Sequence, residues 1–480
     1  MAEPFTPHQW QLDAVQAFDD LDGVFIGLDP GVGKTYALAL IARRDPEGTL
    51  LLTPAPRQAV AQFRSYGVPA YELARGPGEG VAVATYAWLT RRERAGFFAQ
   101  HRPRVVLLDE YHMVRGLGHS ARRRLERYLV ERPEVRVAVA TGSPMSGRLH
   151  DFAYGLTWAL RSRVRGLVPP LRAGLDALDE HLAASTSARE DFRRRLAATP
   201  GVFLDVQAGQ YEGRIDFRVL RMAPVARLPA TWETPSGVLI GSAAHAAEVD
   251  RQLSWGFYLD VRPRPSERYL EARRVWGATV RRAVEQGLAD TEVQVRELEP
   301  ARYQVWLEAQ RREGDVADPS VVWLPEAERA LRQVDQWVAE YSSPPLVWAE
   351  HRALQDAVAR GLDVPLHREG CRAWDGGMPT DHTQTAVLSI DACYQSYNLQ
   401  ANRSTNLVLE PQPDPEVMKQ LIGRTARQGQ PEPVVRVDLV ANGPRGLTAL
   451  REAHARASLV LETTGKNNPL LKLNPDLFEE

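Results

Sequence analysis

Short runs of apolar residues alternate with stretches of helical pattern in the first third of the chain. Each run is aliphatic or branched and is followed by polar or turn-forming residues. The runs occupy residues 24–28, 50–53, 81–84, 105–108 and 137–140. Continuous apolar strands separated by helices are typical of a parallel sheet that helices cover on both faces. Ligands of such folds bind beyond the carboxyl ends of the strands, where this chain places its polar residues.

The pattern changes between residues 164 and 320, a region rich in arginine, alanine and glutamate. Helical periodicity dominates it, and apolar residues recur every fourth position in 266–286. A strand-like stretch at 202–222 interrupts the helices. We interpret this region as a mainly helical insertion.

The alternation of apolar runs and helices returns near residue 321. The runs there occupy residues 346–349, 386–390, 407–409 and 434–440, after a loop at 342–345. We therefore predict an α/β protein with two lobes built on parallel sheets. Its predicted parts are lobe one at 1–163, the insertion at 164–320, lobe two at 321–443 and a C-terminal helix and tail at 444–480.

The most specific local signal is the segment 28–35, with the sequence LDPGVGKT, between an apolar run and a helical stretch at 36–43. This context is the one that a phosphate-binding loop requires. Glycines let backbone N–H groups approach phosphates, and the following helix N-terminus favours their negative charge. The strict pattern has glycine where Leu28 stands, so the loop is a variant. The residues predicted to hold the nucleotide phosphates are Gly31, Val32, Gly33, Lys34 and Thr35.

Lys34 is notable because the chain strongly prefers arginine: lysine and arginine together number 59, and only four of them are lysine. A compact ammonium fits a phosphate cradle where a planar guanidinium does not. Lys34 is therefore expected to contact the β- and γ-phosphates, and the Thr35 hydroxyl to bind Mg²⁺. A glycine-rich turn without a ligand is the alternative.

Two adjacent carboxylates, Asp109 and Glu110, follow the apolar run at 105–108. Asp109 is expected to hold Mg²⁺ through water, and Glu110 to polarise the attacking water. An acidic loop would give the same pattern. Thr141 and Ser143 follow the next run, and their hydroxyls could link the carboxylates to the other lobe; a plain turn explains them equally well.

A basic segment at 420–430 contains Arg424 and Arg427. Pro415 indicates a helix start, which would place the two arginines three residues apart on one helix face. Paired arginines directed at a γ-phosphate stabilise the charge that develops in phosphoryl transfer. A solvated basic helix end is the alternative.

These four segments, in this order, resemble motifs I, II, III and VI of the superfamily-two DEAD/DEAH-type helicases. The sequence DEYH at 109–112 resembles a DEAH-type box, and the segment 424–430 resembles the Swi/Snf-like branch and phage-encoded helicases. Further segments resemble the glutamine motif and motifs Ia, Ib, IV and V. They lie at 7–9, 52–54, 84–86, 345–348 and 397–400. Motif V departs from the family, because Gln395, Ser396 and Tyr397 replace its usual glycines.

The resemblance implies two RecA-like lobes with ATP and Mg²⁺ bound in the cleft between them. Lobe one would supply the phosphate loop and the water-activating carboxylate, and lobe two would supply Arg424 and Arg427. Gln9 would read adenine, and Gln420 would also contact the nucleotide. The residues implied to couple hydrolysis to movement are His112, Thr141 and Ser143. The residues implied to contact nucleic acid are Thr53, Pro54, Arg57, Thr85 and Asn398.

Composition places limits on this interpretation. The chain has 480 residues, a net charge of −2 and two cysteines, Cys371 and Cys393, without metal-type spacing. No apolar run reaches the roughly 18 residues of a membrane span, and the N-terminus has no apolar signal core, so a cytoplasmic protein is expected. Arginine clusters occur at 122–124, 193–195, 273–274 and 281–282, and we interpret them as solvated helix faces rather than a phosphate track.

The function expected from these features is that of an ATP-dependent DNA helicase or translocase in phage or bacterial replication, recombination or repair. DNA is favoured over RNA as partner because no RNA-recognition signature is present. A replication or repair protein is a further expected partner. The alternatives are an RNA helicase, a nucleic-acid-binding scaffold with weak ATPase activity, and a small-molecule kinase that uses the phosphate loop.

Overall fold

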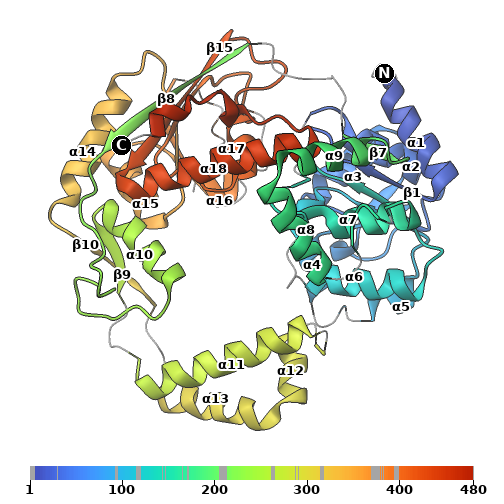
Figure 1. Ribbon diagram of the computed structural model, residues 1–480, viewed down its shortest axis with the longest axis horizontal. Coiled ribbons are helices and arrows are strands. Elements are labelled where there is room, and N and C mark those ends of the chain that lie inside the picture. The colour runs from blue at the N-terminus through green and yellow to red at the C-terminus, as the bar shows by residue number, and fades with distance from the viewer. Residues whose placement is uncertain are drawn as a thin grey trace. The chain divides into compact units, whose positions relative to one another are not determined.

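The computed structural model describes most of the chain. The described residues are 6–29, 31–91, 94, 96–114, 120–142, 144–145, 147–164, 166–169, 172–204, 213–260, 265–286, 288–289, 291–313, 318–368, 379, 381, 383–393 and 399–478. The chain forms two compact units (Figure 1). Unit 1 comprises Met1–Ala208, Ser266–Asp315 and Leu459–Lys466, and unit 2 comprises Gly209–Pro265, Val316–Ser458 and Asn467–Glu480.

Unit 1 is built on a seven-stranded parallel sheet in the order β3-β4-β2-β5-β6-β1-β7. The strands are β1 Gly23–Ile26, β2 Thr49–Leu52, β3 Ala70–Glu72, β4 Val81–Ala84, β5 Val105–Leu108, β6 Arg136–Ala140 and β7 Val202–Phe203. All five predicted strands are present. The short edge strand β3 was not predicted, because its three residues carry no recognisable apolar run, whereas β7 lies at the start of the strand-like stretch predicted at 202–222.

Helices cover both faces of this sheet, as the continuous apolar strands predict (Figure 1). One face packs against α1 Gln9–Leu21, α2 Lys34–Ala42 and α3 Pro56–Ser65. The other packs against α4 Tyr86–Thr90, α5 Phe97–His101, α6 Ser120–Glu131, α7 His150–Leu160, α8 Arg172–Ala184 and α9 Thr186–Ala197. Side chains alternate between the faces along a strand: Phe25 belongs to the second core, Val24 and Ile26 to the first.

Unit 2 is built on a six-stranded parallel sheet in the order β12-β13-β11-β14-β15-β8. The strands are β8 Arg214–Met222, β11 Leu346–Ala349, β12 Leu366–His367, β13 Ala386–Ser389, β14 Thr405–Val408 and β15 Val434–Asn442. One face packs against α16 Ile390–Cys393, α17 Pro415–Ile422 and α18 Gly443–Thr464, and the other against α14 Ala327–Ala339 and α15 Arg352–Leu362. The predicted class of two RecA-like α/β lobes is therefore confirmed.

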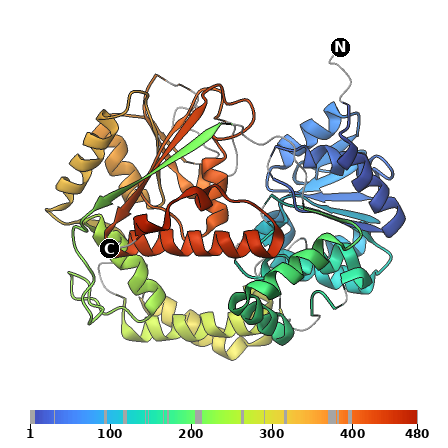
Figure 2. The ribbon, with the colours of Figure 1, turned by 45° about the horizontal axis from the view of Figure 1, so that its top comes forward.

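The region 164–320 does not form one contiguous body. Its first part, with α8, α9 and β7, belongs to unit 1. Strand β8 pairs with β15 over nine residues and completes the sheet of unit 2, as Figure 2 shows for the green and red-orange strands. Helix α10 (Ala243–Ser254) and the antiparallel pair β9 (Phe257–Asp260) and β10 (Ser320–Trp323) also belong to unit 2.

The remaining part of this region is helical. Helices α11 Glu267–Glu285, α12 Glu292–Leu298 and α13 Pro300–Glu313 share a small core around Trp276, Val295 and Trp306. Trp276 and Trp306 therefore serve packing, as do the buried Trp255, Trp337 and Trp348 of unit 2. None of the helices in the described parts of the chain combines the length and apolar character that crossing a membrane requires.

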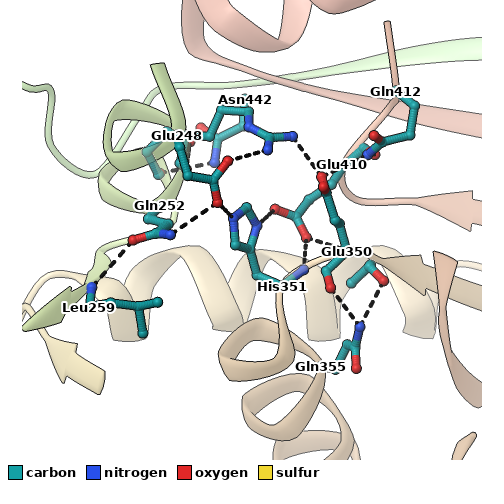
Figure 3. A network of polar contacts seen from close by, with 12 residues as sticks. Glu248, Gln252, Leu259, Glu350, His351, Gln355, Glu410, Gln412 and Asn442 are labelled. Carbon is teal, nitrogen blue, oxygen red and sulfur yellow. Dashed lines mark hydrogen bonds and ion pairs between the residues drawn. The ribbon is translucent and has the colours of Figure 1, made fainter. Parts of the chain in front are cut away.

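A polar network fastens α10 to the sheet of unit 2 (Figure 3). His351, which precedes α15, contacts Glu410 through Nδ1 and Glu248 of α10 through Nε2, the latter at 2.5 Å. Arg251 of α10 pairs with Glu350 at 2.6 Å. Burial opposes protonation of the imidazole, but the two carboxylates outweigh it and raise the pKa of His351 to about 10. The network therefore holds an imidazolium between two carboxylates.

Candidate active site

The phosphate loop lies between β1 and α2, at the carboxyl end of a strand that is flanked by β6 and the short edge strand β7. Gly31 and Gly33 have φ angles of +90° and +89°, which residues other than glycine rarely adopt. A Cβ at Gly33 would also lie 2.5 Å from the side-chain nitrogen of Gln11. Val32 is buried between the glycines, and Pro30 lies outside the described residues. Both glycines are thus required by the geometry of the loop.

Lys34 is the first residue of α2, and its side chain is buried against the loop. Its ammonium donates hydrogen bonds to the carbonyl oxygens of Leu28 at 2.9 Å and Asp29 at 3.0 Å. Thr35 follows in the first turn of the same helix and is half-buried. The loop therefore places an ammonium, a hydroxyl and a helix N-terminus together, which is a favourable site for a phosphate chain.

Gln11 supports this loop and was not identified from the sequence. Its Nε2 donates to the carbonyl of Gly33 at 3.0 Å, and its Oε1 accepts from the backbone N–H of His8 at 2.8 Å. Gln9, the predicted adenine reader, is exposed and donates to Asp13 at 2.8 Å. The helical periodicity of the sequence could have indicated Gln11. It shares the buried face of α1 with Ala14, Val15 and Phe18, whereas Gln9 does not.

Asp109 and Glu110 follow β5, which lies two strands from β1 in the same sheet. Thr53 donates its hydroxyl hydrogen bond to Asp109 at 3.1 Å and is almost completely buried. This predicted nucleic-acid residue is thus engaged with the acidic pair. Glu110 has a φ of +50°, a conformation that is sparsely populated outside glycine and often occurs at functional sites.

The predicted coupling residues meet Glu110. Its Oε2 accepts a hydrogen bond from the backbone N–H of Gly142 at 3.3 Å and lies 3.3 Å from Nδ1 of His112. The same His112 nitrogen is 3.3 Å from the hydroxyl of Thr141, which is fully buried. The third motif therefore contacts the acidic pair within unit 1. Ser143 lies outside the described residues.

The two carboxyl groups have pKa values that are displaced in opposite directions. Burial and the charge of Glu110 raise the pKa of Asp109 above its ordinary range. Burial also opposes ionisation of Glu110, but the hydrogen bond from His112 and the charge of Lys34 outweigh it and lower its pKa. Glu110 is thus the carboxylate that remains ionised at lower pH, as a proton acceptor must.

In unit 2, α17 begins at Pro415, as predicted, and Asp414 caps it by accepting the N–H of Glu416 at 2.9 Å. The helix ends at Ile422, so the prediction that Arg424 and Arg427 share a helix face is wrong. Gly423 is the C-cap of the helix, and the N–H groups of Arg424 and Thr425 bond carbonyls three residues back, closer than the four-residue spacing of an α-helix.

Arg424 and Arg427 therefore lie in consecutive turns after α17. Arg424 is buried and Arg427 is half-buried, and this burial lowers the pKa of the Arg427 guanidinium. Gln420 is buried in the last turn of α17. A solvated basic helix end does not describe this segment.

The arginine-bearing turn is fixed to the sheet of unit 2 by buried polar side chains. Trp348 of β11 donates to Asn406 of β14 at 3.1 Å, and Asn406 donates to the hydroxyl of Thr425 at 2.8 Å. Gln430 donates to the carbonyl of Thr425 at 2.9 Å. Asn398 lies outside the described residues, but the neighbouring Leu399 donates its N–H to the carbonyl of Arg424 at 3.0 Å. The segments predicted as motifs V and VI are thus adjacent.

The remaining predicted nucleic-acid residues differ in their surroundings. Pro54 and Arg57 are exposed, and Arg57 lies 3.8 Å from Glu72. Thr85 caps α4, because its hydroxyl accepts the N–H of Trp88 at 2.9 Å. Only Pro54 and Arg57 of the described candidates in this set present exposed side chains.

Comparison of the sequence with protein-family models and with curated protein sequences finds no match.

Proposed function

We propose that this protein is a nucleic-acid-stimulated ATPase of the helicase type, which hydrolyses ATP to move along or remodel DNA. The observation that carries the proposal is the convergence of three groups in unit 1. Lys34, Asp109 and Glu110 lie at the carboxyl ends of strands in one sheet, and the charge of Lys34 acts on both carboxylates. This combination is the one needed to hold a triphosphate and activate water.

Magnesium is the metal that these residues suit. The Thr35 hydroxyl and the Asp109 carboxylate are hard oxygen ligands. Among the described residues, no group of three or more His, Cys, Asp or Glu side chains is arranged to hold a metal. Mg²⁺ is usually bound by one or two carboxylates together with substrate phosphates and water. When bound, the ion would neutralise charge on the β- and γ-phosphates.

Each residue of the site then has a defined task. The Lys34 ammonium binds phosphate oxygens, and the loop N–H groups orient the chain of phosphates. Glu110, held ionised by His112 and Gly142, accepts a hydrogen bond from the attacking water and then its proton. Arg424 and Arg427 are proposed to stabilise charge on the γ-phosphate, and Gln420 to contact the nucleotide.

The wider role is also a proposal. DNA as the track, a replication or repair protein as a partner, and the cytoplasm of a bacterial or phage-infected cell as the location are supported by the resemblance of the motifs. An RNA track would use the same ATPase residues. A silent scaffold is disfavoured because a full set of Lys34, Asp109, Glu110, Arg424 and Arg427 is present.

The test is the steady-state ATPase rate without polymer and with single-stranded DNA, duplex DNA or RNA, with Lys34→Ala as control. We expect a large rise with DNA that the variant lacks. A rise with RNA alone would transfer the proposal to an RNA helicase. Hydrolysis that no polymer changes would favour the kinase, and no hydrolysis under any condition would contradict the proposal.

A further inference from the structure

A second basic site lies on unit 1, in a pocket of about 480 Å³ between α5 and α6, two helices that lie on the same face of the sheet (Figure 1). Four arginines line it, Arg102, Arg124, Arg127 and Arg132, together with a single carboxylate, Glu131. The whole chain carries a net charge of −2, so this concentration of guanidinium groups does not reflect a generally basic surface.

Two of the arginines donate to backbone carbonyls, and a third, Arg132, pairs with Glu134. Arg124 is almost completely buried and donates from Nη1 to the carbonyl oxygens of Leu89 at 2.5 Å and Arg91 at 2.8 Å, at the end of α4. Arg102 ends α5 and donates to the carbonyl of Ala99 at 3.2 Å. The expectation that the 122–124 cluster is a solvated helix face is wrong for Arg122 and Arg124, which are both buried.

The floor of the pocket is aromatic but offers no surface for a nucleobase. Phe98 and Tyr128 stack on each other with centroids 4.5 Å apart, and both are buried. The Tyr128 hydroxyl donates to the carbonyl of Pro103 at 2.7 Å. The ligand must therefore be recognised by its charge, and several guanidinium groups around one hollow suit adjacent phosphate groups.

The pocket is separate from the phosphate loop. Arg102 lies just before β5 and Arg132 just before β6, so the pocket is toward the amino ends of the strands. The phosphate loop and the acidic pair are at the carboxyl ends. We infer that this arginine pocket is a second phosphate-binding site, which takes the linked phosphates of a nucleic-acid backbone or of a free oligophosphate. Only the nucleic-acid source depends on the proposed function.

The experiment uses the full chain in a Lys34→Ala background, which removes the ammonium of the phosphate loop. Binding of pyrophosphate and of an oligothymidylate is measured by titration at several salt concentrations. The test variant is Arg102→Ala/Arg127→Ala, because both side chains are exposed and Arg124 can be left to support α4. The control is Arg311→Ala/Arg312→Ala, which removes two exposed arginines of α13.

We expect the test variant to bind at least one of the two probes about tenfold or more weakly, since charge-assisted hydrogen bonds are lost. For the single-stranded oligothymidylate, the slope of log affinity against log salt should also fall by about 1.4, because two phosphate contacts are lost. Loss of pyrophosphate binding alone identifies a free oligophosphate, and loss of oligothymidylate binding alone identifies a strand. Unchanged binding of both probes, or an equal loss in the control, would overturn the inference. The proposed function is tested separately: the ATPase activity of the test variant and of the control variant is measured in protein that retains Lys34.

Discussion

Two glutamines of one helix, Gln9 and Gln11, have different surroundings in unit 1. Gln11 is buried and bonded to the phosphate loop, whereas Gln9 is exposed. The hydrogen bond from Gln11 to the carbonyl of Gly33 restrains the N-cap residue of α2. Residues two positions apart on a helix point in different directions, so Gln11 supports the phosphate loop while Gln9 lies on the surface.

We expect Gln11→Ala to weaken ATP and GTP binding alike by about tenfold, because the loop loses a buried hydrogen bond. Gln9→Ala, if Gln9 reads adenine, should instead reduce the preference for ATP over GTP. Equilibrium binding of both nucleotides measures the difference. Gln16→Ala, an exposed glutamine of the same helix, is the control and should change neither value. Equal effects of all three variants would contradict this assignment.

Glu110→Gln should lower the ATPase rate by about 10² to 10⁴-fold, because the amide cannot accept the proton of water. ATP binding should persist, since the substitution leaves Lys34 and the loop unchanged. Single-turnover hydrolysis and equilibrium binding separate the two effects. Wild-type turnover in this variant would show that the proton acceptor is another group.

At the scale of elements, a cationic side chain connects α10 to the sheet of unit 2. His351 lies between Glu410, which follows β14, and Glu248 of α10 (Figure 3). The contacts join a helix from the region 164–320 to strands that follow much later in the sequence. Removal of one partner from a buried ion pair leaves a charge uncompensated, which is strongly destabilising.

The raised pKa of His351 predicts a pH-dependent stability. The folded-state value is about 10, against about 6.5 in the unfolded chain. The folded state therefore binds more protons, so this contribution is complete below about pH 6.5 and is lost as pH rises toward 10. His351→Gln should lower the unfolding free energy by about 3 kcal/mol at neutral pH. The variant should also lose less of its unfolding free energy than the wild-type protein does as pH rises from about 6.5 to about 10.

Urea unfolding of the wild-type protein and of His351→Gln, from about pH 6.5 to about pH 10, measures this contribution. His245→Gln changes an exposed histidine of α10 and serves as the control. If the stabilities of the wild-type protein and of His351→Gln remained separated by a constant amount over this range, the imidazolium would not be the stabilising species.

At the scale of the whole molecule, the proposed chemistry is divided between two α/β units. Unit 1 contains the phosphate loop and the acidic pair, and unit 2 contains Arg424 and Arg427. Buried side chains of unit 2, Asn406 above all, hold the arginine-bearing turn on its own sheet. Each unit thus presents its functional groups on an independently packed core.

The proposal requires unit 2 to take part in hydrolysis. Arg427→Ala should lower the DNA-stimulated ATPase rate about 10³-fold while equilibrium ATP binding changes little, because an arginine finger acts mainly on the transition state. Arg360→Ala removes an exposed arginine of α15 and should leave the rate unchanged. An Arg427→Ala rate equal to that of the control would restrict the catalytic residues to unit 1.

The sequence by itself determined the class of the fold and the local form of the phosphate loop. Parallel strands that are buried on both faces must be continuously apolar, so β4, β5 and β11 could be located to the residue. The glycines, Lys34 and the acidic pair are recognisable because their chemistry depends on local spacing and on the ends of strands.

Only the tertiary structure decided which distant segments meet. The pairing of β8 with β15, the support of Gly33 by Gln11 and the contact between Thr53 and Asp109 join residues far apart in the sequence. No local pattern encodes such partners, because they depend on sheet order and on how helices pack. The arginine pocket has the same origin: the sequence of 122–124 is basic, and packing against α4 and α5 decides that Arg124 lines a hollow instead of facing solvent.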